Sequence, residues 1–313
     1  MNVTFPVQIS DFEPDSPWAH LNGYRPQTFT WADFLRAAMV AGYPDLASLP
    51  SRQFARWRTA AFHLGLRHDR GQLIQPPEWA QLDPSEKAAI SSLLGIVVTK
   101  LLVERLLNAP IFLFLDVHFT VIYPPGVERI RPDIAAMTPA GQWFSVEAKG
   151  RSRFRQATLE KAKRQAKSLG TVNDDPVLAG VACITSFRAG RLEARFADPP
   201  PSPKEAADGH IEPMDALCRY YGQLDRFRKY SEPLSEHAVF NEYPGVNFMY
   251  SRELDVSFGI LPQVEKALKE QSADEIFAVL KDIAEPRIAE LHPELGPDGI
   301  VVIPGESWKS DDV

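Results

Sequence analysis

The sequence predicts an α/β protein in which a mixed central sheet is flanked by helices, with mainly helical additions at the N- and C-terminal ends. Three observations favour this fold class. A long helical pattern follows Asp83, strand-like stretches fill much of residues 113–196, and helical periodicity returns after the proline-rich segment 199–203. We therefore expect three regions: a mainly helical N-terminal region (1–82), a core (83–198), and a Pro-rich linker with a C-terminal helical extension (199–313).

The composition is that of a globular protein with enough residues for a large buried core. Of the 313 residues, 44% are hydrophobic and 24% are charged, which excludes a mostly disordered or collagen-like chain. No run of about 18 apolar residues occurs, so we expect no membrane span. The first residues lack a signal-peptide pattern, and two cysteines cannot form a disulfide framework, so we expect a cytoplasmic protein.

The N-terminal region is expected to begin irregularly and then to form two helices. Residues 1–28 show no regular pattern, and helix-like stretches follow at 31–41 and 52–66. The second stretch is rich in arginine, which leaves two interpretations open. It is either a small nucleic-acid-binding module of helix-turn-helix type or, as we prefer, a helical subdomain with a solvated arginine face, because no specific motif is present.

The core region is expected to contain two helices and five strands. Asp83 or Ser85 can cap a long helix that runs to about Asn108, and Pro110 prevents its continuation. Alternation of apolar side chains predicts a strand over 113–121, and a basic amphipathic helix is expected over 156–169. Further strands are expected at 129–138, 142–150, 177–187 and 191–196.

Beyond the proline-rich segment, apolar residues recur at helical spacing. This periodicity predicts helices at 213–230, 264–271 and 273–291. A short apolar strand is expected at 299–304.

Two carboxylates and an amine are expected to converge in the hairpin formed by the strands 129–138 and 142–150. Glu147-x-Lys149 is the only Asp/Glu-x-Lys sequence in the chain, and it follows Asp133 by fourteen residues. If the turn centres on Ala140, opposed residues have numbers that sum to 280, so that Asp133 faces Glu147 with Cβ atoms ~5 Å apart. Lys149 shares this face of the sheet. Because close carboxylates repel unless a cation lies between them, the hard oxygen ligands suit Mg²⁺ or Mn²⁺.

The segment Pro132-Asp133 followed by Glu147-Ala148-Lys149 resembles the motif of the PD-(D/E)XK, or restriction-endonuclease-like, nuclease superfamily. The order helix, three-stranded meander, helix, strand over residues 85–187 is similar to the core of that superfamily, and covers about 100 of the 313 residues. The resemblance implies that Asp133, Glu147 and the carbonyl of Ala148 bind the metal. It also implies that Lys149 orients or activates the attacking water.

Two further site residues follow from the same resemblance. The first helix of these nucleases often supplies an acid, and Glu104 fits because it continues the apolar face of the long helix. An acid on an apolar face is costly unless it is paired or bound to a metal, so the alternative is a boundary acid that reaches solvent or pairs with Arg105. The helix after the catalytic strand contributes a polar or basic residue in related nucleases. Gln165 and Lys161 are candidates for this role, and the alternative is a solvated helix face.

A concentrated basic stripe follows the motif in an otherwise acidic chain. The net charge is −7, from 34 basic and 41 acidic residues, and without the window 149–167 it becomes −14. The stripe is either a solvated helix face or, next to a phosphodiesterase site, a surface that neutralises phosphates. Its candidate nucleic-acid-binding residues beyond Lys149 are Arg151, Arg153, Arg155, Lys161, Lys163, Arg164 and Lys167.

The sequence therefore leads to the hypothesis of a Mg²⁺- or Mn²⁺-dependent nuclease, endo- or exonucleolytic, with a role in restriction or phage defence. Nucleic acid is the expected partner, and only the family resemblance favours DNA over RNA. The sequence leaves open whether the protein forms a homodimer or binds a partner protein. No membrane partner is expected. Two alternatives remain: a catalytically inactive nucleic-acid-binding or regulatory protein with the same fold, and an interaction subunit of a larger complex in which Glu147 and Lys149 form a chance surface ion pair.

Overall fold

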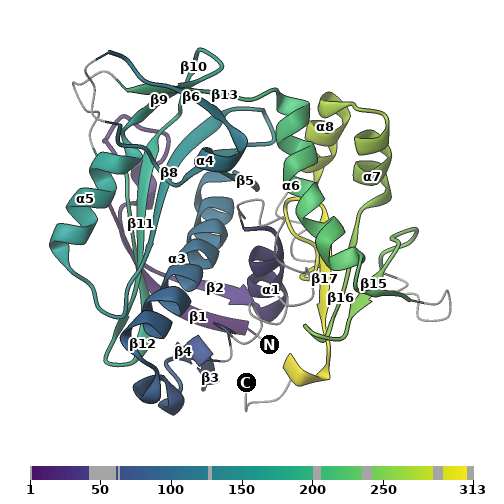
Figure 1. Cartoon of the computed structure of the whole chain (residues 1–313), viewed down its shortest axis with the longest axis horizontal. Coiled ribbons are helices and arrows are strands. Elements are labelled where there is room, and N and C mark those ends of the chain that lie inside the picture. The colour runs from purple at the N-terminus through teal and green to yellow at the C-terminus, as the bar shows by residue number, and fades with distance from the viewer. Residues whose placement is uncertain are drawn as a thin grey trace.

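The structure is a computed structural model that describes residues 2–41, 61–62, 64–125, 129–199, 206–234, 242–284 and 292–308. Within these residues the protein is α/β, with a large mixed sheet and seven α-helices (Figure 1). One hydrophobic cluster runs from Val3 to Trp308, so both terminal regions share a core with the central sheet. None of the described helices has the length and apolar character needed to cross a membrane.

The central sheet has nine strands in the order β2-β1-β4-β12-β11-β8-β7-β5, with β3 attached to β4. β5, β7 and β8 form an antiparallel meander, and β11 lies parallel to β8 on its other side. The strands are β1 (Asn2–Ser10), β2 (Gly23–Thr30), β3 (Arg67–Asp69), β4 (Gln72–Ile74), β5 (Ile111–Phe114), β7 (Ile134–Met137), β8 (Trp143–Gly150), β11 (Gly180–Arg188) and β12 (Arg191–Ala197).

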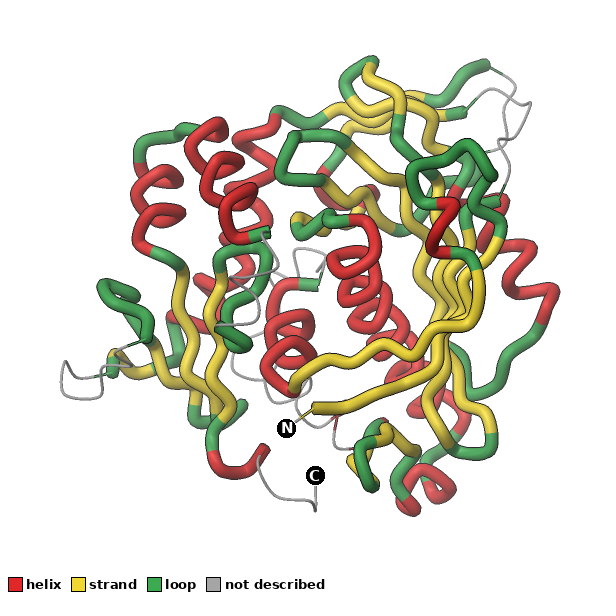
Figure 2. The backbone as a smooth tube through the Cα atoms, turned by 180° about the vertical axis from the view of Figure 1, so that it is seen from behind, coloured by secondary structure: helices red, strands yellow, loops and turns green. Residues whose placement is uncertain are grey.

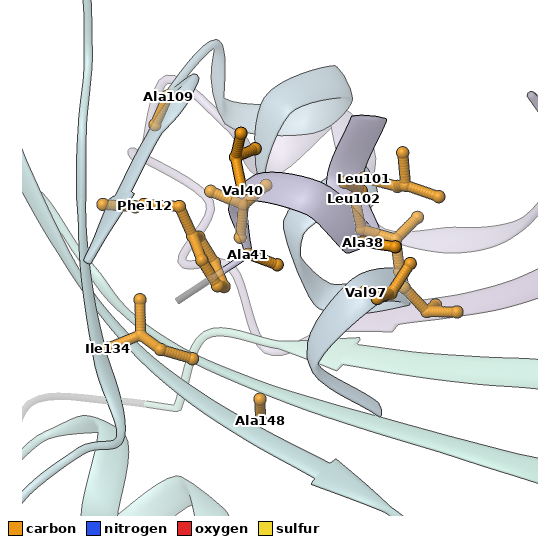
Figure 3. Packing of buried hydrophobic residues seen from close by; sticks show 14 of the residues in the cluster. Ala38, Val40, Ala41, Val97, Leu101, Leu102, Ala109, Phe112, Ile134 and Ala148 are labelled. Atoms are coloured by element: carbon orange, nitrogen blue, oxygen red, sulfur yellow. The ribbon is translucent and has the colours of Figure 1, made fainter. Parts of the chain in front are cut away.

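Helix α3 (Pro84–Leu107) covers one face of this sheet, together with α1 (Trp31–Val40). Asp83, one of the two caps that the sequence offers, accepts hydrogen bonds from the backbone of Ser85 and Glu86 at the start of α3. The helix ends at the expected place, and Asn108 follows it in the left-handed conformation. Figure 3 shows side chains of both helices close to Ile134 of β7 and Ala148 of β8. On the opposite face, α5 (Gln156–Ala166) packs through Leu159, Ala162 and Ala166.

The approach of α3 to β8 depends on two glycines. A Cβ atom at Gly150 would lie 1.5 Å from the carbonyl oxygen of Ser91, and one at Gly95 would lie 2.4 Å from the backbone nitrogen of Gly150. Only residues without a side chain allow this contact between helix and strand. The backbone of Lys149 and Gly150, at the end of β8, is therefore held directly against α3.

Two smaller sheets complete the fold. The first has the order β10-β9-β13-β6 and is made of β6 (Thr120–Ile122), β9 (Leu169–Val172), β10 (Asp175–Pro176) and β13 (Ala207–His210). The second, β14-β15-β16-β17, is made of β14 (Glu232–Pro233), β15 (Met249–Ser251), β16 (Val256–Ile260) and β17 (Ile300–Pro304), and helices separate it from the central sheet (Figure 2). Helices α6 (Pro213–Arg228), α7 (Pro262–Lys269) and α8 (Ala273–Ile283) accompany it.

Most elements predicted for the core are present, but one strand is wrong in its centre. The stretch 113–121 is not continuous, because the short helix α4 (Leu115–His118) separates β5 from β6. The backbone N–H of Leu115 donates to the carbonyl of Asp133 at 3.0 Å, so the pairing of this segment with the β7 side continues to the first residue of α4 and ends there. The alternation of apolar residues thus continues through α4, so this pattern alone could not show where β5 ends.

The terminal regions also differ from the prediction. Residues 2–10 and 23–28 are not irregular, since β1 and β2 pair along eight residues and extend the central sheet, whereas residues 11–22 between them form turns and a short 3-10 helix. Proline in both strands argues against pairing, but Pro6 and Pro26 lie opposite one another in a pair where β2 forms the sheet edge. The C-terminal helices and the strand at 300–304 are present, but β14 to β16 were missed. Most of the predicted helix at 52–66 lies outside the described residues.

Candidate active site at the end of a β-hairpin

The hairpin formed by β7 and β8 has the predicted register. Ile134 pairs with Val146, Ala136 with Phe144 and Met137 with Trp143, so that every pair of numbers sums to 280. The turn between the strands fixes this register through Gly141, whose φ of 76° favours glycine, and through the hydroxyl of Thr138. That hydroxyl accepts hydrogen bonds from the backbone of Ala140 and of Gln142.

Asp133, Glu147 and Lys149 come together at the open end of this hairpin. The backbone N–H of Asp133 donates to Glu147 Oε2 at 2.9 Å. Lys149 Nζ lies 3.1 Å from Asp133 Oδ2 and also forms an ion pair with Glu147 Oε1. The sequence-based expectation of two carboxylates and one amine on the same face therefore agrees with the geometry.

The electrostatics of the three groups are unequal. Glu147 has no exposed surface, whereas the Asp133 side chain is 36% exposed. Burial, and then the neighbouring Asp133 carboxylate, raise the pKa of Glu147 from 4.5 to about 7, against the opposing effect of Lys149. Burial alone would lower the pKa of Lys149, but the two carboxylates raise it above its ordinary value, so the ammonium stays charged. With both carboxylates ionised, the cluster carries one uncompensated negative charge.

The carbonyl of Ala148 points toward the same open end. The backbone N–H of Ser145 donates to Ala179, and the carbonyl of Trp143 accepts from Leu178, so the odd-numbered residues of β8 face the β11 side. The N–H and C=O of one residue point to the same side of a strand, so Ala148 faces the β7 side.

The residue opposite Ala148 in this register is Pro132, which has no N–H to donate. The ladder between β7 and β8 ends at Ile134 and Val146, two residues before this position. The Ala148 carbonyl is therefore left available at the edge where Asp133 and Glu147 lie. Pro132 was part of the sequence motif, but the reason for a proline there becomes clear only from the register.

These oxygen atoms suit a hard divalent cation. The described residues contain no group of three or more His, Cys, Asp or Glu side chains arranged to hold a metal ion. Mg²⁺, however, is usually bound by one or two carboxylates and keeps several water molecules. Asp133, Glu147 and the Ala148 carbonyl match that requirement.

Gln165 lies beside the site, whereas Lys161 is not brought into contact with it. The amide of Gln165 donates to the carbonyl of Arg131 at 3.4 Å, next to the Pro132-Asp133 segment. Its Oε1 atom is buried and has no hydrogen-bond partner within the described part of the chain. A buried unpaired oxygen is costly, so this atom is a ready acceptor for a water or a substrate donor at the site. Lys161 is exposed and forms no hydrogen bond or ion pair with the described residues.

Glu104 belongs to a different cluster. Its carboxylate accepts hydrogen bonds from the Arg36 guanidinium at 2.8 and 3.0 Å and from Lys100 Nζ at 2.5 Å. Asp298 completes this cluster at 2.9 Å from Arg36. The sequence predicted either a metal ligand or a boundary acid at Glu104, and neither describes this arrangement. The cluster could not be foreseen because Asp298 and Arg36 are 194 and 68 residues away from Glu104 in the chain. We therefore do not include Glu104 in the site.

Part of the basic stripe is neutralised within the protein. Lys163 pairs with Asp11 at 2.8 Å, and Lys167 pairs with Asp198 at 2.6 Å. Five other basic residues of the stripe are exposed, and none forms an ion pair with described residues: Arg151, Arg153, Arg155, Lys161 and Arg164. The cations available to a phosphate therefore concentrate in the loop before α5 and on the exposed side of that helix.

Searches of protein-family models, of curated proteins and of solved structures each returned no match to this chain. The functional interpretation therefore depends on the geometry of the site itself.

Proposed function

We propose that this protein is a metal-dependent phosphodiesterase that cleaves nucleic acid, with Mg²⁺ or Mn²⁺ as the cofactor. The observation that carries the proposal is the convergence of Asp133, Glu147 and Lys149, which the register of one hairpin brings to the position where Pro132 has no N–H to donate to the Ala148 carbonyl. The preference for DNA over RNA comes only from the resemblance to the PD-(D/E)XK motif. A role in restriction or phage defence has the same origin.

In this proposal each residue has a separate task. Asp133, Glu147 and the Ala148 carbonyl would hold the cation, which would lower the pKa of a bound water and stabilise charge in the transition state. Lys149 stays charged beside both carboxylates, where it can orient the attacking water by hydrogen bonding. The unpaired oxygen of Gln165 supplies an acceptor next to Asp133. The partial exposure of Asp133 leaves the cation position accessible to a substrate.

The exposed part of the basic stripe supports nucleic acid as the substrate. Arg151, Arg153 and Arg155 follow Lys149 directly in the chain and are exposed. Phosphate neutralisation by such side chains supplies most of the affinity in nonspecific nucleic-acid binding. Because Lys163 and Lys167 have internal partners, the contribution of the stripe is expected from its arginines.

The experiment is a cleavage assay with Mg²⁺, Mn²⁺ or EDTA on linear, circular and single-stranded DNA and on RNA. Glu147→Gln and Lys149→Met should reduce cleavage by several orders of magnitude, since loss of about 1.4 kcal/mol of transition-state stabilisation already costs tenfold. The exposed residues Glu78 and Lys281 provide matched controls as Glu78→Gln and Lys281→Met. A Glu147→Gln protein that folds normally and cleaves at the wild-type rate would end the proposal.

One observation favours the alternative of a catalytically inactive nucleic-acid-binding or regulatory protein. Lys149 already contacts both carboxylates, so the three groups form a connected ion cluster without a metal. That alternative predicts nucleic-acid binding with no cleavage in any divalent cation. It also predicts that Mg²⁺ leaves the melting temperature unchanged.

A further inference from the structure

The face of the central sheet that carries Lys149 continues across four more strands. Lys149 pairs with Ile184 of β11, Ile184 with Arg195 of β12, Arg195 with Gln8 of β1, and Gln8 with Tyr24 of β2. Directly opposed residues share one face of a sheet, so these side chains form a row that begins at the proposed site. Tyr24, at the end of the row, is 67% exposed.

The loop that begins the basic stripe lies against this face. The Arg195 guanidinium is 3.7 Å from the centre of the Phe154 ring, and the backbone N–H of Arg151 donates to the Thr185 carbonyl at 2.9 Å. Phe154 stands between the exposed Arg153 and Arg155 in the sequence. The loop of the stripe is therefore in direct contact with the side chain of Arg195 in β12.

The hairpin between β11 and β12 adds two arginines to the same face. Arg188 and Arg191 lie directly opposite one another, and Arg191 pairs across the sheet with Ile74, which pairs in turn with Arg67 of β3. Arg188 and Arg191 are both exposed, and neither side chain forms a hydrogen bond or ion pair with the described residues. The acids on this part of the face are Glu193 and Asp69. Two like charges opposed in a hairpin destabilise it, so a bound anion would relieve the repulsion.

We infer that nucleic acid bound at the proposed site extends over the β11–β12 hairpin, where Arg188, Arg191 and Arg195 contact its phosphate backbone. The inference rests on the proposed function for the identity of the ligand. Two strand spacings and four residues along β12 separate Lys149 from Arg191, a diagonal of roughly 16 Å. This distance corresponds to about five base pairs of duplex, at ~3.4 Å of axial rise for each.

The opposed arginines allow a test in which binding and folding change in opposite directions. Arg191→Glu replaces a like-charged pair by an attractive pair with Arg188, so the melting temperature should rise. Loss of one phosphate contact makes the slope of log affinity against log salt shallower by about 0.7–0.9. At about 0.15 M salt, this change corresponds to an affinity about four- to fivefold lower than wild type, with about 1 M salt as the reference. Arg188→Gln/Arg191→Gln should lose about 15- to 30-fold on the same scale. Arg219→Glu, at an exposed position of α6, is the matched control and should bind as wild type.

Binding is measured by fluorescence anisotropy in EDTA with labelled duplex and single-stranded DNA, and cleavage is measured separately with Mg²⁺. Weaker binding by Arg191→Glu, together with an unchanged Arg219→Glu control, supports the inference. Wild-type affinity in Arg191→Glu and in the double variant overturns it, even if cleavage is normal. If the wild type binds DNA but never cleaves, the proposed function fails, and the affinities of the variants still decide this inference. A wild-type protein that neither binds nor cleaves overturns both.

Discussion

The replacement of Glu147 by Gln should raise the free energy of unfolding relative to wild type, and this difference should grow as the pH rises. The folded state holds a proton on Glu147 up to a pKa of about 7, whereas the unfolded chain loses it near 4.5. The unfolded state therefore binds fewer protons between these values, so the wild-type free energy of unfolding falls as the pH rises through this window. The difference of about 2.5 pH units, at about 1.4 kcal/mol for each, corresponds to about 3.5 kcal/mol once Glu147 is fully ionised. The glutamine side chain does not ionise, so the variant does not have this free-energy cost.

The assay is denaturant unfolding of wild type and Glu147→Gln in EDTA at pH 5 and at pH 8. The stability of the variant relative to wild type should increase by about 2–3 kcal/mol between the two pH values. Glu78→Gln, which removes one exposed charge outside the site, corrects for the change in net charge. A relative stability of Glu147→Gln that is the same at both pH values would refute the argument that burial and Asp133 disfavour the ionised carboxylate.

Three further predictions follow from the same geometry. Mg²⁺ at about 100 times its Kd should stabilise the wild type by about 2.7 kcal/mol but not Glu147→Gln, and equal shifts in calorimetry would contradict a site at Glu147. Glu104→Gln should lose about 3–5 kcal/mol in denaturant unfolding, because it leaves Arg36 buried with less compensation, while the cleavage rate of the folded fraction is kept. Normal stability with lost cleavage would return Glu104 to the active site. Gly95→Ala should cost about 1–3 kcal/mol by forcing α3 away from Gly150, and an unchanged melting temperature would show that the helix moves freely.

The part of the site that could be predicted from the sequence is the part that one hairpin determines. A centred turn and strict alternation place Asp133 opposite Glu147, and the observed register agrees residue by residue. Helix α3 could be predicted equally well, because a capping residue before it and Pro110 after it give local signals at its two ends. These features depend on residues close in sequence, so their geometry follows from backbone rules alone.

The features that could not be predicted depend on contacts between distant segments. Pro6 disfavours a strand in the sequence of β1. The strand is nevertheless formed, because it pairs in parallel with β12, nearly 190 residues later in the chain. Arg188 and Arg191 appear in the sequence as two ends of a turn, and nothing local shows that they share a face with Lys149. Gly150 follows the motif directly, but its importance comes from Ser91 of α3. Such features need the three-dimensional arrangement of the sheet.

The comparison of the two buried acid clusters gives the strongest physical reason to place a cation at Glu147 rather than at Glu104. Glu104 and Asp298 are buried with Arg36 and Lys100, two anions with two cations, and the partly exposed Asp33 lies at the edge. Burial raises the pKa of Asp298, but Arg36 and Lys100 more than offset this and hold it below its ordinary value.

Among the described residues, Glu147 and Asp133 form ion pairs with one cation, Lys149, and there the effect of burial prevails, so the pKa of Glu147 rises to about 7. From the sequence both acids look alike, each following apolar neighbours in a regular element. A buried acid whose charge is balanced by cationic side chains of the same protein does not require a cation from solution. A buried acid left with one negative charge in excess, beside a carbonyl to which Pro132 cannot donate, would be stabilised by an added divalent cation. Under the proposed function, metal binding would convert the cost of burying Glu147 into affinity for the ion.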